Sequence, residues 1–461
     1  MSREPVSFAD GVSSGTPRRE LTLLDSTCII VGIIIGAGIY RSSPDVAQSV
    51  PDGWWLLFCW LLGGVMSLIG ALCYAELVTA YPHAGGDYVY LSRAFGRPLG
   101  FLFAWSQFWI VRPGSIGAMA YAFAEYANQL WPHAAGDAKA FVLSAYASAA
   151  IIALTLVNLL GIREGKWTQN LLTIAKALGL TLLILIGLTH TAPAAQASTA
   201  EPTTFSFSGF GMAMIFVLFT YGGWNEIAYV GAEVKNPQRN VLRALLIGTA
   251  AVTAIYLLVN AAFLHALGLA GTRNPAAAAI VLESALGEWG SRALCLLICI
   301  SALGAVNGQT LTGARIYYAV GAEHRLYAWL SRWNPQRGTP YCSLLLQSTI
   351  TLALILGFGS VKEGFESMVK FTTPAFWFFF SLVGVALMIL RRREPEVTRP
   401  FPVPGYPVLP LLFCLSSVYM FYAGLAYAVE HRSWEALWSV GLLLLGVIVT
   451  FVESRQPRNA N

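Results

Sequence analysis

A short apolar stretch, GIIIGAGIY (residues 32–40), contains three glycines within seven positions. A glycine in a helix interior costs about 1 kcal/mol relative to alanine, so this cluster is unfavourable in an unbroken helix. We therefore expect a helix break at Gly36-Ala37-Gly38. A second break is expected at Gly222-Gly223, inside the apolar stretch FTYGGWNE (219–226).

A helix break can bind charge without any charged side chain. It creates one end with free N–H groups and partial positive charge, and one with free C=O groups and partial negative charge. Two such breaks together offer sites for the carboxylate and the ammonium of a free amino acid. Gly32 and Gly36 also form a small-x-x-x-small pattern that brings helices into close contact, so close packing is the alternative explanation for the first motif.

Three charged residues lie inside apolar stretches. Lys176 lies about eight residues into one of them; near the bilayer centre a lysine costs about 2.5–3.5 kcal/mol, whereas near the boundary its ammonium can reach the interface. Arg112 precedes Pro113 and is either a structural charge bonded to carbonyls freed by the kink or part of a gate. Glu226 is either the partner of Arg112 or a protonatable coupling group.

The elements that must position these residues are membrane helices. The chain has 461 residues, of which 56% are hydrophobic and 11% charged, against about 25% charged in soluble domains. A spanning helix needs roughly 20 apolar residues, and these runs are too long and uniform for barrel strands. We predict an all-α integral membrane protein with about twelve helices, at 23–48, 53–80, 99–127, 140–160, 168–190, 208–232, 242–267, 292–320, 342–358, 367–390, 406–428 and 434–453. Short helices lying flat on the membrane are an alternative around 265–292 and 320–342.

The basic residues indicate orientation. Most of the 29 Lys and Arg residues fall in segments on the same side as the N-terminus, which the positive-inside rule assigns to the cytoplasm. We expect a multi-pass protein of the plasma (inner) membrane with both termini cytoplasmic. The basic residues are spread over many short loops, which argues against nucleic-acid binding. Glu76, Asp87 and Glu233 lie near predicted cytoplasmic helix ends, among Arg93, Lys235 and Arg239, either as inner-gate salt bridges or as solvated charges.

The two breaks also suggest how the chain is organised. If five helices form a unit, the broken first and sixth helices occupy corresponding places, which points to the binding site of a secondary transporter. Because five is odd, the second unit must run inverted. We therefore expect a cytoplasmic tail (1–20), a first repeat (21–190), an inverted second repeat (205–391), a linker with two additional helices (392–455) and a second tail (456–461).

Several of these segments resemble one family. VGIIIGAGIY resembles the first-helix signature of the amino acid–polyamine–organocation superfamily, in particular its L-type amino acid transporter-like branch. FTYGGWNEIAYVGAEVKNPQRNVLRAL (219–245) is similar to the sixth helix and following loop of that group. YAELVTAYPHAGGDYVYLSRAFG (74–96) and ALGAVNGQTLTGARIYYAVGAEHRL (302–326) resemble its second-to-third helix region and its eighth helix.

The resemblance implies a fold and a set of site residues. The fold is the five-plus-five inverted repeat of the leucine transporter, the example usually given for this architecture, with two extra C-terminal helices. Substrate-binding residues would be Ile35, Gly36, Ala37 and Gly38 on the first helix, with Phe219, Thr220, Gly222 and Asn225 on the sixth. Phe219 matches an aromatic residue that covers the substrate. Many relatives have serine at Ala37, so a hydroxyl is lost here while the backbone N–H remains.

The same resemblance gives Lys176 a role. It occupies the place where sodium-coupled relatives hold a cation between the first and eighth helices, and Ser301 matches a hydroxyl lining that place. An ammonium there would replace the sodium ion. The expected function is sodium-independent exchange of neutral L-amino acids by alternating access.

Other functions remain as alternatives. Within transport, these are a proton-coupled amino acid symporter and an amine or polyamine carrier; outside it, a membrane sensor or channel. The sequence has no H-E-x-x-H or P-loop motif, so we expect no enzymatic activity, no cofactor and no metal. Some animal relatives bond to a glycoprotein through the loop between helices three and four; here that loop (128–140) has no cysteine, so no disulfide-linked heavy chain is expected.

Overall fold

The computed structural model describes residues 17–132, 138–191, 204–358, 364–430 and 433–454. Most of the expected first tail, the whole second tail and the central parts of the loops at 128–140 and 189–206 lie outside these residues. The described chain is almost entirely helical and contains two isolated β-bridges, Leu21 with Val234 and Asn334 with Thr339. This confirms the all-α prediction.

The helices follow the predicted runs closely. In chain order they are α1 (Leu23–Ile34), α2 (Gly38–Gln48), α3 (Gly53–Ala80), α4 (Asp87–Phe95), α5 (Arg97–Ser106), the π-helix η1 (Gln107–Val111), α6 (Arg112–Leu130), α7 (Ala138–Leu160), α8 (Ile162–Thr189), α9 (Phe207–Thr220), the 3₁₀-helix η2 (Trp224–Glu233), α10 (Pro237–Thr272), α11 (Ala277–Leu286), α12 (Trp289–Glu323), the 3₁₀-helix η3 (Arg325–Ser331), α13 (Tyr341–Phe358), α14 (Gly364–Arg393), α15 (Val408–Glu430) and α16 (Trp434–Ser454).

Nine helices in the described ranges are long and apolar enough to cross a membrane, and the bent pair α1–α2 makes ten. Two further predicted spans coincide with α13 and with the consecutive segments α5, η1 and α6, so the number twelve stays a prediction. Short helices also lie within 265–292 and 320–342, where α11 and η3 are found. The chain is a multi-pass membrane protein.

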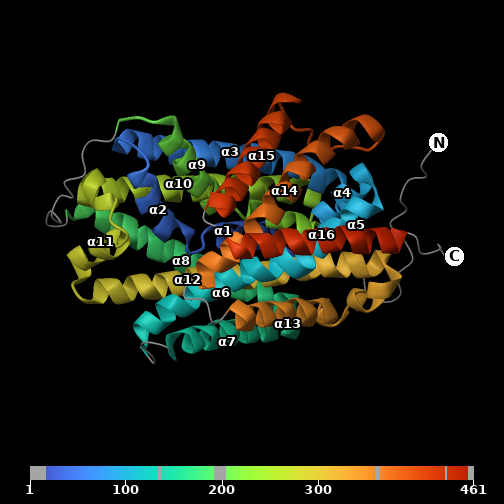
Figure 1. Cartoon of the computed structure of the whole chain (residues 1–461), viewed down its shortest axis with the longest axis horizontal. Helices are drawn as coiled ribbons and strands as arrows, with labels where there is room; N and C mark the ends of the chain where they lie inside the picture. The colour runs from blue at the N-terminus through green and yellow to red at the C-terminus, as the bar shows by residue number, and fades with distance from the viewer. Residues whose placement is uncertain (1–16, 133–137, 192–203, 359–363, 431–432, 455–461) are drawn as a thin grey trace.

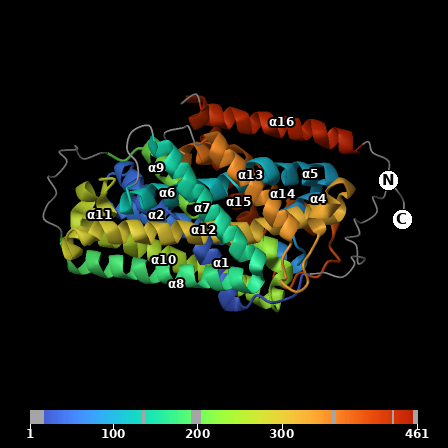
Figure 2. The same ribbon diagram turned by 90° about the horizontal axis from the view of Figure 1, so that it is seen from below.

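Most of the long helices run roughly parallel to one another (Figure 1). Helices α1, α6 and α12 lie in the middle of the bundle, and α7 and α13 lie along one edge (Figure 1). In the turned view α16 lies at the outer edge (Figure 2), where it packs on α5 and α14. Of the candidate spans, α12 is the most enclosed by protein and α16 the least. Helix α12 therefore lies at the centre of the bundle, and both α1 and α6 pack against it.

Local sequence signals fix where the helices begin. Thr22 and Asp25 form a capping box at the start of α1, in which the Thr22 N–H donates to Asp25 Oδ2 at 2.9 Å and the Asp25 N–H donates to Thr22 Oγ1 at 3.2 Å. Asp52 caps α3 by accepting a bond from the Trp55 N–H. Caps of this kind satisfy N–H groups that the helix itself leaves free.

Candidate functional site

The first helix is broken where the glycines predicted. Helix α1 ends at Ile34, α2 begins at Gly38, and the two are bent by 49°. The Ile35 N–H bonds to Val31 O at 3.0 Å and the Gly36 N–H bonds to Ile34 O at 2.8 Å. The break thus satisfies these two donors itself. The N–H groups of the first turn of α2, which starts at Gly38, have no partner within the helix.

The second break lies directly against the first. Helix α9 ends at Thr220, and Gly223 has a φ of 118°, in the left-handed region that favours glycine. A Cβ at Gly223 would lie 2.8 Å from Cγ2 of Ile33 and 3.4 Å from the backbone N of Ile34. Glycine is therefore needed here both for its backbone angles and for the close approach of the two breaks.

Tyr256 on α10 connects the two breaks. Its hydroxyl lies 3.1 Å from the carbonyl oxygen of Ile34 and 3.4 Å from that of Thr220, the last residues of α1 and α9. A single hydroxyl proton is thus shared between two helix C-termini. The sequence did not indicate this role, because a tyrosine within an apolar run has no distinguishing spacing or charge.

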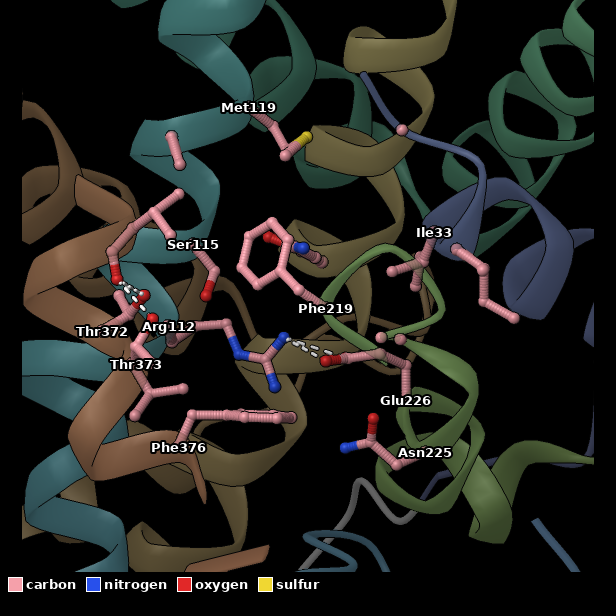
Figure 3. A pocket seen from close by; sticks show the side chains of 18 of the residues that line it. Ile33, Arg112, Ser115, Met119, Phe219, Asn225, Glu226, Thr372, Thr373 and Phe376 are labelled. Carbon is pink, nitrogen blue, oxygen red and sulfur yellow. Dashed lines mark hydrogen bonds and ion pairs between the residues drawn. The ribbon is translucent and has the colours of Figure 1, made fainter. Parts of the chain in front are cut away.

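The two breaks border a cavity of about 140 Å³, which is lined on its other sides by η1, α6, α12 and α14. One water needs about 10–15 Å³ when volume is measured in the same way. The cavity can therefore hold several waters or a small ligand. Eight of the predicted site residues line it: Gly36, Gly38, Arg112, Phe219, Thr220, Gly222, Asn225 and Glu226. In Figure 3 the ring of Phe219 lies between Met119 and Arg112. Ile35, Ala37, Lys176 and Ser301 are fully buried and lie outside the lining.

Lys176 reaches the end of the first helix from α8. Its Nζ donates to the carbonyl oxygens of Gly32 at 2.8 Å, Ile35 at 2.7 Å and Ser301 at 3.0 Å. The side chain is fully buried, so the alternative that it reaches the membrane interface is wrong. Ser301 contributes its backbone carbonyl to this contact rather than the hydroxyl that the resemblance suggested. An ammonium at the carbonyl end of α1 is favoured by the helix dipole.

Gly32 has the packing role that the sequence allowed as an alternative. A Cβ at Gly32 would collide with the side chains of Gln169 and Thr173 on α8. Both side chains donate to the Cys28 carbonyl, at 3.4 Å and 3.0 Å. The glycine motif therefore combines a helix contact at Gly32 with a break at residues 35–37.

Arg112 and Glu226 form a buried ion pair at the cavity (Figure 3). Nη1 of Arg112 donates to both carboxylate oxygens, at 2.9 Å and 2.8 Å, and the Thr312 hydroxyl donates to Oε2 at 2.5 Å. The predicted partnership is confirmed, and the alternative in which Arg112 bonds to freed carbonyls is wrong. The π-helix η1 directly precedes Arg112; Pro113 has no N–H to donate to the preceding turn, and π-bulges are frequent at functional sites.

A hydrogen-bonded chain leads away from the cavity. Asn225 donates to the Tyr229 hydroxyl at 3.5 Å, and that hydroxyl donates to Oδ2 of Asp87 at 2.7 Å. Asp87 lies at the start of α4, outside the membrane-spanning segments, and is buried. Burial is the main cause that raises the pKa of its carboxyl to about 7.

Glu76 and Glu233, the other two acidic residues predicted near cytoplasmic helix ends, also form ion pairs. Their partners are not the basic residues that the sequence analysis named beside them. Glu233 accepts two bonds from Arg315 on α12, at 2.8 Å and 2.9 Å. Glu76 pairs with Arg391 and Arg399, which lie more than 300 positions later. Both carboxylates are buried, so they are not solvated loop charges. A contact between residues so far apart in the chain cannot be predicted from the residues next to each of them in the sequence.

Comparison with known proteins agrees with this arrangement. Residues 21–449 match a family model described as amino acid permease. The chain is 31% identical over 442 residues to the b(0,+)-type amino acid transporter 1 of Homo sapiens, covering 94% of this chain and 88% of that protein. It is 32% identical over 410 residues to the serine/threonine exchanger SteT of Bacillus subtilis, covering 87% and 90%. It is 29% identical over 405 residues to the Asc-type amino acid transporter 1 of Mus musculus, covering 86% and 75%. The chain therefore belongs to the amino acid permease family, within the L-type branch of the superfamily that its motifs resemble.

Proposed function

We propose that this protein exchanges neutral L-amino acids across the membrane by alternating access and without sodium. The observation that carries the proposal is the meeting of two broken helices at one cavity. Broken helices at corresponding places of two repeats mark the substrate sites of secondary transporters. The names of the relatives, which include amino acid transporters and an exchanger, support the substrate class and the exchange.

The substrate backbone would be bound by the breaks themselves. The first turn of α2, starting at Gly38, presents N–H groups to the substrate carboxylate. The ammonium would lie near carbonyl groups at the end of α9, where Thr220 and Gly222 line the cavity. Phe219 extends into the same space (Figure 3) and would cover the bound substrate. Ile35 and Ala37 would act through the shape of the break, since neither lines the cavity.

Lys176 would make sodium unnecessary. Its ammonium already binds carbonyl groups of α1 and α12, and a second cation at this place would be repelled by it. Its contacts with Gly32 and Ile35 join α8 to the break, so that the three helices would respond together when substrate binds.

Glu226 would serve as a fixed charge rather than as a proton carrier. It is paired with Arg112 and accepts a further bond from Thr312, so both of its carboxylate oxygens are already bonded within the protein. We therefore favour exchange over proton symport through Glu226, and place Arg112 and Glu226 in the part of the cavity wall that joins α6 to η2.

The larger organisation is part of the same proposal. The first repeat would comprise 21–190 and the inverted second repeat 205–391, followed by a linker and two helices at 392–455. The distribution of basic residues supports cytoplasmic termini in a plasma (inner) membrane. The absence of cysteine from 128–140 supports a carrier that works without a disulfide-linked partner.

Uptake into proteoliposomes tests the proposal. Purified protein would be reconstituted into vesicles that are empty or preloaded with a neutral amino acid, and uptake of radiolabelled amino acids would be followed in sodium or choline buffer. We expect uptake that is stimulated by internal amino acid and unchanged in choline. A lack of uptake of every amino acid under all conditions would overturn the assignment, and loss of uptake in choline would overturn sodium independence.

A further inference from the structure

The cavity contains more polar groups than recognition of an amino acid backbone requires. Gln107 on η1 and Gln309 on α12 both line it, and Oε1 of each is buried without a hydrogen-bond partner. Gln107 is only 3% exposed. Leaving such an atom unpaired is unfavourable, and native proteins have few of them. Two such acceptors belong to residues that line one cavity, where a hydrogen-bond donor of a ligand could pair with them.

Two side chains on α6 face the same space. Ser115 lines the cavity, and within the described ranges its hydroxyl has no hydrogen-bond partner. Arg112 commits Nη1 to Glu226, while its Nη2 donates to none of the described residues. Figure 3 shows Ser115 extending from α6 on the side of Phe219, and Arg112 extending from the same helix toward Glu226. Together with the two glutamines they offer both donors and acceptors.

These groups belong to other elements than the backbone groups of the two breaks. The breaks offer N–H and C=O groups for the carboxylate and ammonium, and they belong to α1, α2 and α9. Gln107, Arg112, Ser115 and Gln309 lie on η1, α6 and α12. A substrate held by the breaks would therefore direct its side chain toward them.

The charges in this part of the cavity disfavour a cationic side chain. Arg112 and Glu226 cancel each other in a buried ion pair. A cationic side chain would meet the free donors of Arg112, while both Glu226 oxygens are already bonded. A side chain with a neutral hydroxyl or carboxamide has a donor for the glutamine oxygens and an acceptor for the guanidinium. Val369, Phe376 and Trp377 on α14 supply apolar surface for its aliphatic part.

We propose that Gln107, Arg112, Ser115 and Gln309 form a subsite for the substrate side chain, which selects hydroxyl and carboxamide side chains over apolar ones of the same shape. This inference rests on the proposed function, because it assumes that an amino acid is held at the breaks. A site built to hydrogen-bond a substrate group rejects an analogue without that group, since its own polar atoms then stay unpaired.

Pairs of amino acids with matched shape test the subsite in the unmodified protein. Threonine and valine differ in a hydroxyl against a methyl group, and glutamine and methionine have similar length. In proteoliposomes we expect kcat/KM to favour threonine over valine and glutamine over methionine by about tenfold or more. Equal values, or values that favour the apolar partner, would overturn the subsite. Failure to transport any of the four would instead count against the proposed function.

Variants assign the selectivity to the named residues. Gln107→Leu and Gln309→Leu should each bring the threonine-to-valine ratio to within about threefold of unity, mainly by loss of threonine transport. Gln129→Leu makes the same chemical change on α6 at an exposed position outside the cavity lining, and should keep the parent ratio. Unchanged ratios in both cavity variants would overturn the assignment. If a variant does not fold, heat protection of the purified parent by threonine but not by valine would still support the subsite, and equal protection would overturn it.

Discussion

Nζ of Lys176 lies 2.7 Å from the carbonyl oxygen of Ile35, the residue at which α1 gives way to the break. The ammonium also binds the Gly32 and Ser301 carbonyls, so one side chain of α8 holds both the broken helix and α12. In a membrane, free carbonyls at a helix end must be satisfied within the protein. The break in α1 thus depends on a lysine that lies more than 140 positions away.

Replacing this lysine should disable the carrier without preventing insertion. In Lys176→Met the three carbonyls lose their shared donor, and we expect initial uptake to fall about tenfold or more, with normal amounts of protein in the membrane. Lys370→Met is the matched control, since Lys370 pairs at the protein surface with Glu366 one turn away. Radiolabelled uptake, normalised to membrane protein, measures the effect. Parent-like uptake by Lys176→Met would mean that the lysine serves packing alone.

Gly38 should tolerate no larger side chain. Even a Cβ at Gly38 would lie 3.2 Å from Cγ2 of Thr220 across the two breaks, and valine adds two methyl groups at the start of α2. We expect Gly38→Val to abolish uptake while the protein still inserts and purifies as a monodisperse species. Gly441→Val is a control in α16, because a Cβ there meets nothing within 4 Å. Uptake by Gly38→Val at the parent rate would return this motif to a packing role.

The sequence predicts the helices and the breaks for direct physical reasons. About 20 apolar residues are long enough to span a bilayer, and clustered glycines are hard to accommodate in a continuous helix. The Arg112–Glu226 pair was foreseeable because a charge in a membrane needs a partner. By contrast, the Tyr256 hydroxyl bonds to backbone carbonyls, and Ser301 contributes its own backbone carbonyl. Neither residue type nor spacing in a sequence reveals a hydrogen bond to the backbone. The Glu76–Arg391 contact arises from packing across the whole chain.

The buried Arg112–Glu226 ion pair can be tested by comparing the stability of single and double variants. Removing one partner leaves an uncompensated buried charge, which typically costs about 3–5 kcal/mol, whereas replacing both is often nearly neutral. We therefore expect Arg112→Met and Glu226→Gln each to lower the thermal unfolding midpoint in detergent, and the double variant to recover most of the loss. Additive losses in the double variant would show that the two residues act independently. A vesicle-trapped pH dye should report no substrate-driven proton movement in the parent, since both carboxylate oxygens of Glu226 are already bonded to Arg112 and Thr312.

Asp87 should make the stability of the protein depend on pH. Its buried carboxyl accepts a hydrogen bond from the Tyr229 hydroxyl, and Tyr74, Arg112 and Glu226 are the other nearby groups. Burial raises the pKa of this carboxyl from 3.8 to about 7. Between these values the folded protein keeps the proton while the unfolded chain releases it. The free energy of unfolding must therefore decrease as pH rises from about 4 to 7, and remain lower above pH 7.

Asn at position 87 cannot ionise, so Asp87→Asn should remove this contribution. We expect the unfolding midpoint of the parent to fall by a few degrees more than that of Asp87→Asn between pH 5 and pH 8. Asp52→Asn is the control, because Asp52 caps α3 at an exposed position and should retain the parent slope. The same slope in the parent and in Asp87→Asn would assign the pH dependence to other groups. Uptake measured over the same range would then show whether protonation of Asp87, which reaches the cavity through Tyr229 and Asn225, also sets the transport rate.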